Sequence, residues 1–271
     1  MQPRVERSAA AIAIDAMLAR LNQLLPAFFL IGLLVFWELA VQVLGIQDFL
    51  LPSPTAIIEK IFEIPGRLLV HTWATLREVL IGFGIALFGG VFLAVIISHS
   101  RTLSRTLYPV LVITQVVPTI AIVPVLTIWL GPTDTSRLLV VFLIAFFPIV
   151  VNTTAGMLRV DEELIDLIRG LNASRWKIFT KIRLPNALPY MFTGMRISIA
   201  LSVIGAVVAE FVIADRGLGY LVFSATSNLD TVLVFAAVTL LAVMGIVLFR
   251  LVLLVQKLAL PWAAESEEGE V

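Results

Sequence analysis

Few side chains in this sequence are suited to covalent chemistry. The 271 residues include no cysteine, so disulfides, thiolate metal sites and a cysteine nucleophile are excluded. The two histidines, His71 and His99, leave little for a histidine-rich metal centre or for catalysis by imidazole. The sequence also lacks a phosphate-binding loop, a zinc-protease motif and a serine nucleophile elbow. We therefore expect no enzymatic activity, no metal site and no cofactor on this chain.

The chemistry that remains is recognition, and it is concentrated in one block of charge at residues 161–185. The chain as a whole is 60% hydrophobic and only 14% charged. Nine side chains in this block are charged, and they are Asp161, Glu162, Glu163, Asp166, Arg169, Arg175, Lys177, Lys181 and Arg183. Near a bilayer centre they would cost roughly 20 kcal/mol or more, at about 2.5 to 3.5 kcal/mol each. The block must therefore lie in water.

Two short amphipathic helices are predicted within this block. Asp161 is suited to cap the first helix, and Asn172 falls where that helix should end, because asparagine tolerates a left-handed conformation. Ser174 then caps a second helix, which Pro185 should terminate. The first helix has one apolar face, formed by Leu164, Ile165, Leu167, Ile168 and Leu171. Nothing in the loop itself can cover that face, so it must lie either on lipid or against another protein.

The elements that position this block are long apolar segments. A mean hydropathy of +1.04 is typical of a polytopic membrane protein. A transmembrane helix needs about 20 predominantly apolar residues. The segments that meet this length are roughly 26–45, 73–98, 107–130, 137–158, 187–213 and 231–256. The sequence therefore predicts an all-α membrane protein with six transmembrane helices.

Lysine and arginine are distributed unevenly between the two sides of these spans. With the N-terminus inside, 13 of them fall in cytoplasmic segments and five in outer loops. The cytoplasmic segments are 1–25, 99–106, 159–186 and 250–271. Because positive charge is retained on the cytoplasmic side, both termini and the charged block are predicted to be cytoplasmic.

A flanking segment is expected at each end of a transmembrane domain at residues 26–260. Residues 1–25 show a helix-period apolar pattern with scattered arginines, which is typical of an amphipathic segment at the membrane interface. A signal peptide is the competing interpretation, and Asp15 and Arg20 within the apolar stretch disfavour it. The tail at 261–271 is acidic and is predicted to be disordered.

Small residues recur every four positions in two of the predicted spans, which allows helix backbones to approach closely. In the second span, this stripe favours packing within the chain. In the fifth, we expect a central location that lines a transport path or a subunit seam, because the stripe ends at an ionisable group. The two stripes are Gly82, Ala86 and Gly90, and Gly194, Ser198, Ser202, Ala206 and Glu210.

Proline and charge inside the spans are further signals. Carbonyls freed by proline are tolerated only where protein or water satisfies them, so kinked helices around a cavity are predicted at Pro118, Pro124 and Pro148. Charges at membrane depth are functional candidates by default. Arg196 and Glu210, near span ends, fit local ion pairing as well as a transport role. Glu38 lies deeper in the first span, which favours hydrogen bonding inside the bundle. The outer loop that follows this span should contain a short helix at 55–64.

A transport path through such a bundle would be lined mainly by uncharged polar groups. Weak contacts suit passage of a small solute, because tight binding would slow its release. The residues expected to face the path are Gln115, Thr119, Asn152, Ser198, Ser202 and Glu210.

The charged block resembles the EAA motif of ABC importer permeases. In that motif a Glu-Ala-Ala triplet, a Gly four residues beyond the triplet and an I-x-L-P ending have fixed spacing, and the ending is matched by Ile182 to Pro185. Asp166 stands at the Glu position and keeps the carboxylate, and Asn172 stands at the Gly position and keeps access to the turn. Leu167 and Ile168 replace the two alanines.

The likeness extends over most of the chain. The matched stretches are similar to the nitrate, sulfonate and taurine branch of these permeases, which also includes permeases for thiamine-precursor pyrimidines and for riboflavin. They are FWELA, LPSPTAII, VVPTIAIVPVLTIWLG, FFPIVVNTTAGM, NASRWKIF and AEFVIADRGLGYLV.

This resemblance implies a type I importer permease fold in the inner membrane, with a cytoplasmic coupling-helix loop between the fourth and fifth helices. It implies a homodimer served by two ATPase subunits, which bind ATP and Mg, and by an extracytoplasmic substrate-binding protein. The solute would be a sulfonate-, taurine- or nitrate-type anion or a pyrimidine- or riboflavin-type vitamin precursor. The residues that would couple to the ATPase are Glu163, Asp166, Leu167, Arg169, Gly170, Leu171, Asn172, Ala173 and Ser174.

The alternative is a self-contained ion-coupled carrier or channel. Two observations weaken it, because the halves show no evident inverted repeat with paired broken helices and no run of intramembrane carboxylates. An ATP-driven importer permease is therefore the favoured interpretation.

Overall fold

The chain folds into a set of long helices, and the computed structural model describes residues 9–116 and 118–262. No strand occurs within these two ranges. The helices are α1 (Ala9–Leu44), α2 (Pro54–Glu63), α3 (Pro65–His99), α4 (Arg101–Thr114), η1 (Thr119–Ile122), α5 (Val123–Leu130), α6 (Asp134–Leu158), α7 (Glu162–Gly170), α8 (Arg175–Ile178), η2 (Phe179–Arg183), α9 (Leu184–Ile213), α10 (Leu218–Ser227) and α11 (Thr231–Ala259). The predicted short helix at 55–64 is confirmed as α2, whose N-cap Ser53 accepts a hydrogen bond from Ala56 N.

Five helices are long and apolar enough to cross a membrane, and a bent pair would bring the number to six. The five are Leu25–Leu44 within α1, then α3, α6, the helix Arg175–Ile213 and α11. The bent pair corresponds to the predicted third span. Its parts, Thr102–Thr114 and Thr119–Leu130, lie at 83° to each other. An all-α membrane protein is confirmed, but the third span is broken rather than a single helix.

Two of the three prolines predicted to kink the spans lie at or just after this break. Pro118 adopts an extended conformation before η1, and Pro124 occupies the first turn of α5, where its missing N–H is not needed. Pro148 behaves differently, because α6 continues through it without interruption. Asn152 donates from its side chain to the Pro148 carbonyl at 2.8 Å. The predicted interruption therefore occurs only in the third span.

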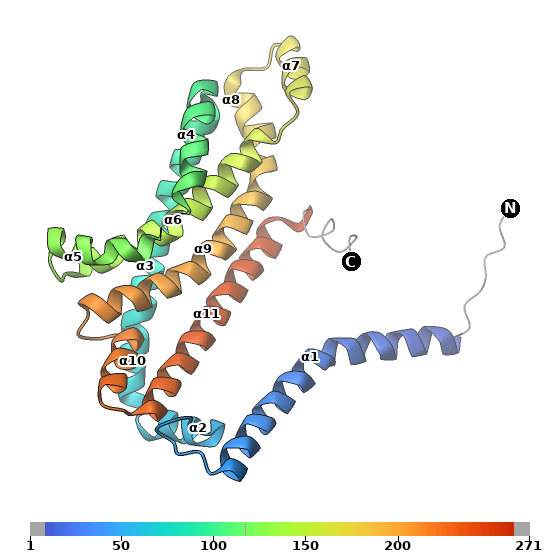
Figure 1. The fold of residues 1–271 in the computed structure, drawn as a ribbon. Helices are drawn as coiled ribbons and strands as arrows, with labels where there is room; N and C mark the ends of the chain where they lie inside the picture. The colour runs from blue at the N-terminus through green and yellow to red at the C-terminus, as the bar shows by residue number, and fades with distance from the viewer. Residues whose placement is uncertain (1–8, 117, 263–271) are drawn as a thin grey trace.

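The centre of the bundle is α6, which lies between α3 and α9 (Figure 1). The small-residue stripe of α3 faces α6, as the sequence predicted. A Cβ atom on Gly82 would lie 2.5 Å from Val141 Cγ1, and one on Gly90 would lie 2.9 Å from Ile149 Cγ2. Larger residues could not occupy these positions without moving α6 away.

The stripe of α9 is also buried against α6. A Cβ atom on Gly194 would lie 2.9 Å from the Pro148 carbonyl oxygen, and Ser198 donates to the Ala145 carbonyl at 2.6 Å. The stripe is central, as predicted. However, it meets α6 of the same chain, so in this conformation it forms a helix contact rather than an exposed surface.

The helix that carries this stripe begins outside the bundle. We predicted that Pro185 ends a second short helix, and this is wrong. Helices α8, η2 and α9 form one continuous helix, and η2 is a π-helical turn in which Leu184 N donates to the Phe179 carbonyl. The π turn changes the hydrogen-bond register just before Pro185, so the helix continues past this residue although it has no N–H to donate.

Helix α1 extends away from the other helices (Figure 1). Only 6% of the most apolar stretch of α1, within Leu25–Leu44, is buried. The helix crosses the predicted boundary at residue 25 without a break. Glu38 joins α1 to α2, because its carboxylate accepts hydrogen bonds from Thr55 N at 3.0 Å and from Thr55 Oγ1 at 2.8 Å. Glu38 thus makes structural hydrogen bonds, but it makes them to the start of α2 at a half-exposed position and not inside the bundle as predicted. Residues 1–8 and the predicted tail beyond 262 lie outside the described residues.

Replacing Gly82 with alanine tests the close contact between α3 and α6. The added methyl group would overlap Val141, so we expect the free energy of unfolding to fall by about 1–3 kcal/mol. Thermal unfolding of the purified protein in detergent measures the effect. Gly84→Ala is the matched control, because nothing lies within 4 Å of a Cβ atom at that position of the same helix. Equal unfolding midpoints for the two variants would contradict this account of the contact.

Candidate functional site

The charged block forms a helical loop that projects from one end of the bundle, while α2 and α10 lie at the other end (Figure 1). Its first helix, α7, is followed by Asn172 in the left-handed conformation, with φ of 63°. Ser174 caps α8 and accepts a hydrogen bond from Lys177 N at 3.3 Å. The predicted turn and second cap are confirmed. Asp161 occupies the predicted N-cap position of α7, but its side chain makes no capping hydrogen bond.

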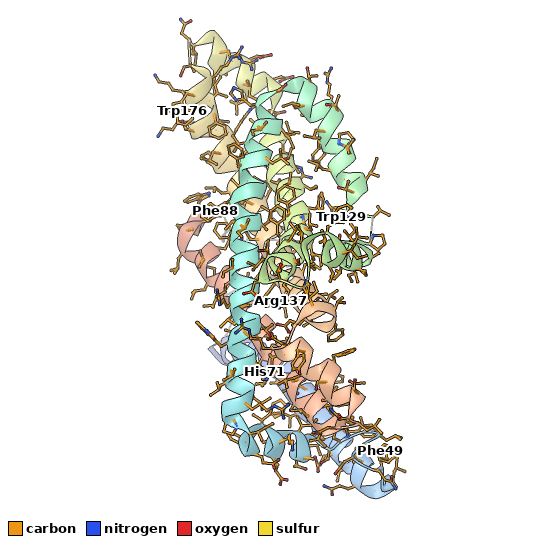
Figure 2. All side chains as sticks on the ribbon, turned by 90° about the vertical axis from the view of Figure 1, so that its left-hand side faces the viewer. Phe49, His71, Phe88, Trp129, Arg137 and Trp176 are labelled. Carbon is orange, nitrogen blue, oxygen red and sulfur yellow. The ribbon has the colours of Figure 1, made fainter. Side chains whose placement is uncertain are left out.

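The apolar face of α7 is divided between the bundle and solvent. Ile165 points inward and is only 4% exposed. Leu164, Leu167 and Leu171 are exposed on the outer side, Leu171 by 76%. We call these three leucines the outer face of α7. Trp176 on α8 is 70% exposed and points away from the body of the molecule (Figure 2). The loop therefore presents apolar groups that no part of the described chain covers.

The other predicted coupling residues surround this outer face. Asp166 and Arg169 form an ion pair of 3.0 Å, which contributes little stability because both side chains are at least half exposed. Nothing lies within 4 Å of a Cβ atom on Gly170, so the helix end there is open to an approaching surface. Of the remaining predicted coupling residues, Glu163, Asn172 and Ser174 are exposed, and Ala173 is half-buried.

The predicted path residues occupy separate places in this conformation. Gln115 is exposed and Thr119 is half-buried, on the two sides of the break before η1. Asn152 is half-buried on α6. Ser198 and Ser202 are fully buried, and Ser202 donates to the Ser198 carbonyl at 2.8 Å. The structure therefore does not gather these side chains around one cavity, and their role in the path stays a prediction.

Glu210, the sixth predicted path residue, belongs to a buried network at the other end of the molecule. Only 1% of it is exposed. Its Oε1 accepts from Thr75 Oγ1 at 2.7 Å and its Oε2 accepts from Gly219 N at 2.6 Å. Thr75 Oγ1 in turn accepts from Leu218 N at 2.8 Å. Side chains of α3 and α9 thus satisfy the backbone N–H groups at the start of α10, which otherwise lack partners within the helix.

The same network explains two glycines at the start of α10. Gly217 has φ of 121°, a conformation that favours glycine, and a Cβ atom there would overlap the Glu210 carboxylate. A Cβ atom on Gly219 would lie 2.8 Å from Glu210 Oε2. His71 Nδ1 lies 3.0 Å from Gly217 N and further ties the loop to α3. Glu210 therefore holds α10 against α3 through direct backbone contact.

A second polar pair is buried between α3 and α6. Arg137 Nε donates to Glu78 Oε1 at 2.7 Å, and the same guanidinium also pairs with Asp134. Arg137 is 4% exposed and lies beside α3 (Figure 2). Sequence reasoning missed this pair, although Glu78 falls inside a predicted span and could have been noted there. Removing one partner of such a pair typically costs about 3–5 kcal/mol, because the other charge stays buried.

Comparison with known proteins identifies clear relatives. Residues 86–261 match the model of the family described as "Binding-protein-dependent transport system inner membrane component". A formylaminopyrimidine transport permease protein of Halalkalibacterium halodurans is 33% identical over 238 residues, which cover 88% of this chain and 95% of the relative. A riboflavin transport system permease protein of Chloroflexus aurantiacus is 38% identical over 234 residues, covering 86% and 87%.

Two further comparisons extend the range of relatives. A taurine transport system permease protein of Escherichia coli is 31% identical over 242 residues, covering 87% of this chain and 88% of the relative. Among solved structures, an inward-facing form of the MetNI methionine ABC transporter aligns with a TM-score of 0.54 at 20% identity, covering 70% of this chain and 98% of that one. At this identity, the structural match supports the fold alone.

Replacing Thr75 with valine tests the network around α10. The hydroxyl both donates to Glu210 and accepts from Leu218 N, so its loss leaves two buried groups without a partner, at about 1–3 kcal/mol each. We expect a lower unfolding midpoint and faster amide hydrogen exchange in α10 than in the unmodified protein.

Thr72→Val is the control, because the Thr72 hydroxyl bonds only to the Leu68 carbonyl of its own helix among the contacts described. Hydrogen exchange followed by mass spectrometry measures both variants. Unchanged exchange in α10 of the Thr75 variant would show that the network does not hold this helix.

Proposed function

The chain belongs to the family of binding-protein-dependent transport system inner membrane components, and from this membership we propose how it works as the permease of an ABC importer. Permeases of this kind form the membrane passage of an importer. The chain is therefore a multi-pass inner-membrane transport component rather than an enzyme. Family membership leaves the coupling residues, the partners and the solute to be inferred from the surfaces and side chains of this particular chain.

We propose that α7 is the coupling helix and docks into a groove on a cytoplasmic ATPase subunit. The observation that carries this proposal is the uncovered outer face of α7, formed by Leu164, Leu167 and Leu171. Burial of a leucine side chain is worth about 1.5–3 kcal/mol, so an apolar groove would bind this face favourably. Helix-in-groove recognition of this type depends on apolar anchors spaced along one side of a short helix.

The continuous helix Arg175–Ile213 supplies a mechanical link for this coupling. It starts beside α7, crosses the bundle against α6 and ends at the Glu210 network that holds α10. Closure of the ATPase around ATP and Mg would therefore displace a rigid element rather than a flexible linker. Such rigid-body movement could shift the equilibrium between inward-open and outward-open states.

The partner set is inferred from the surfaces that one chain leaves open. We propose a homodimer, as the family resemblance implies, in which α1 is free to contact the second copy because it packs little on its own chain. Two ATPase subunits would bind the two α7 helices. An extracytoplasmic binding protein would deliver solute at the end that carries α2 and α10. The distribution of lysine and arginine supports this orientation, with both termini in the cytoplasm.

The solute is proposed to be a small anion or a neutral heterocycle. Relatives are described as transporting formylaminopyrimidine, riboflavin, taurine and nitrate. The predicted path offers uncharged polar groups apart from Glu210, which suits passage without tight binding. Such a path would leave selection among these solutes to the binding protein.

Replacing Leu171 with aspartate tests the docking proposal. A charge on the outer face of α7 would oppose burial in an apolar groove, so we expect at least tenfold less ATPase to copurify, and loss of ATP-driven uptake. Leu229→Asp is the matched control for copurification, because Leu229 is equally exposed, at 76%, and lies beside α10 at the end opposite the proposed ATPase contact. Full copurification and uptake in the Leu171 variant would refute the docking role. Transport by the purified chain without any ATPase in proteoliposomes would instead support an ion-coupled carrier or channel.

Single cysteines test the path in a chain that has none of its own. We expect Gln115→Cys, at an exposed position, to react with an aqueous thiol reagent in at least one nucleotide state. Cysteine at Ser198 should react only if α6 and α9 separate during the cycle, because Ser198 is fully buried here. Mass spectrometry of labelled proteoliposomes measures the reaction. Protection of both positions in ATP-bound and ATP-free states would exclude them from the path.

A further inference from the structure

A basic cavity lies behind α7, on the side opposite its outer face. Its volume is about 810 Å³. Arginines from four elements line it, namely Arg105 of α4, Arg169 of α7, Arg175 of α8 and Arg183 of η2. His99, the last residue of α3, lines it as well. We propose that this basic cavity binds a phosphate-type anion, either a lipid headgroup or a free phosphate, which ties the charged loop to the membrane bundle.

The charges around the basic cavity have one sign. In the part of the chain that the structure describes, no aspartate or glutamate lines it. The carboxylate of Asp166 bonds Arg169 at 3.0 Å but is itself outside the lining. Arg183 donates to the Ser98 carbonyl at 2.8 Å, which fixes its guanidinium at the inner end of the cavity. Guanidinium groups match phosphate oxygens in pairs of hydrogen bonds, so several of them converging on one space favour an anion of this geometry.

The remaining lining suits the part of a ligand next to the phosphate. The apolar floor includes Ile165 and Ile178, each 4% exposed, and Met157, 1% exposed. Ser98 and Ser104 also line the wall. Ligand pockets usually measure about 300–1,000 Å³, so the space accommodates a phosphate together with a glycerol-sized group.

The location points to the membrane surface. The lining residues place the cavity where α3 ends, α4 begins and the charged loop returns to α9. Figure 1 shows this end of the bundle, which carries α7 and α8. This is the end predicted to face the cytoplasm, where anionic lipid headgroups attract basic residues. A bound anion would connect α7 and α8 of the loop to α4 and η2 of the bundle. Its expected effect is on the stiffness of the loop, since the outer face of α7 lies on the other side of the helix.

The test compares the full-length chain in nanodiscs of phosphatidylcholine with and without phosphatidylglycerol. We expect phosphatidylglycerol to raise the unfolding midpoint and to remain bound in native mass spectrometry. In the double variant Arg105→Gln/Arg175→Gln, the rise should be at most half as large. Arg67→Gln/Arg250→Gln is the charge-matched control, because neither arginine lines the cavity, and it should respond like the unmodified protein.

Further measurements identify the source of the anion and control for misfolding of the glutamine double variant. Arg105→Lys/Arg175→Lys keeps the charge and should keep most of the response. Inorganic phosphate titrated into phosphatidylcholine nanodiscs identifies a free anion if it reproduces the rise, and a lipid headgroup if only phosphatidylglycerol does so.

Two results would overturn the proposal. One is equal stabilisation of the glutamine double variant and its control. The other is no stabilisation by either probe. Loss of ATPase copurification in the glutamine double variant alone would then assign the arginines to an acidic surface of the ATPase.

Discussion

Close backbone contact of α6 with α3 and α9 is the constraint on which the rest of this structure depends. Apolar side chains gain nothing from leaving lipid for one another, so membrane helices associate through tight packing and hydrogen bonds. Here Gly82 and Gly90 bring α3 onto α6, while Gly194 and Ser198 bring α9 onto its other side. Helices α4, α5, α10 and α11 pack on this three-helix centre, and the charged loop joins it through α8 and η2, whereas α1 contacts α2 instead.

Buried polar contacts fix the relative positions of the helices that the small residues bring together. The pair of Arg137 with Glu78 joins α6 to α3, and Glu210 with Thr75 joins α9 and α10 to α3. Each contact is buried, so its hydrogen bonds and charges are difficult to replace by water. The result is a stiff unit that runs from the charged loop at one end to α10 at the other. The proposed coupling needs such a unit, because force applied at the loop must reach the far side of the membrane.

The sequence predicted the candidate site better than it predicted the interior. Asn172 and Ser174 were identified correctly because turns and caps depend on local backbone preferences. Pro185 was assigned wrongly, since a π turn from the preceding residues lets one helix continue through it. The buried pair of Glu78 and Arg137 was missed because its two members lie far apart in sequence, and no local pattern marks residues that meet only in the folded bundle.

The sequence by itself determined the membrane class, the helical content, the charged loop and its uncovered apolar face, since these depend on composition and on periodicity along one helix. Tertiary structure decided which helices meet. It placed the stripe with Ser198 against α6 instead of leaving it exposed, broke the third span near Pro118 and gathered four arginines around one cavity. The physical reason is that a hydrophobic pattern identifies the lipid-compatible segments, whereas their mutual arrangement depends on contacts between residues distant in the chain.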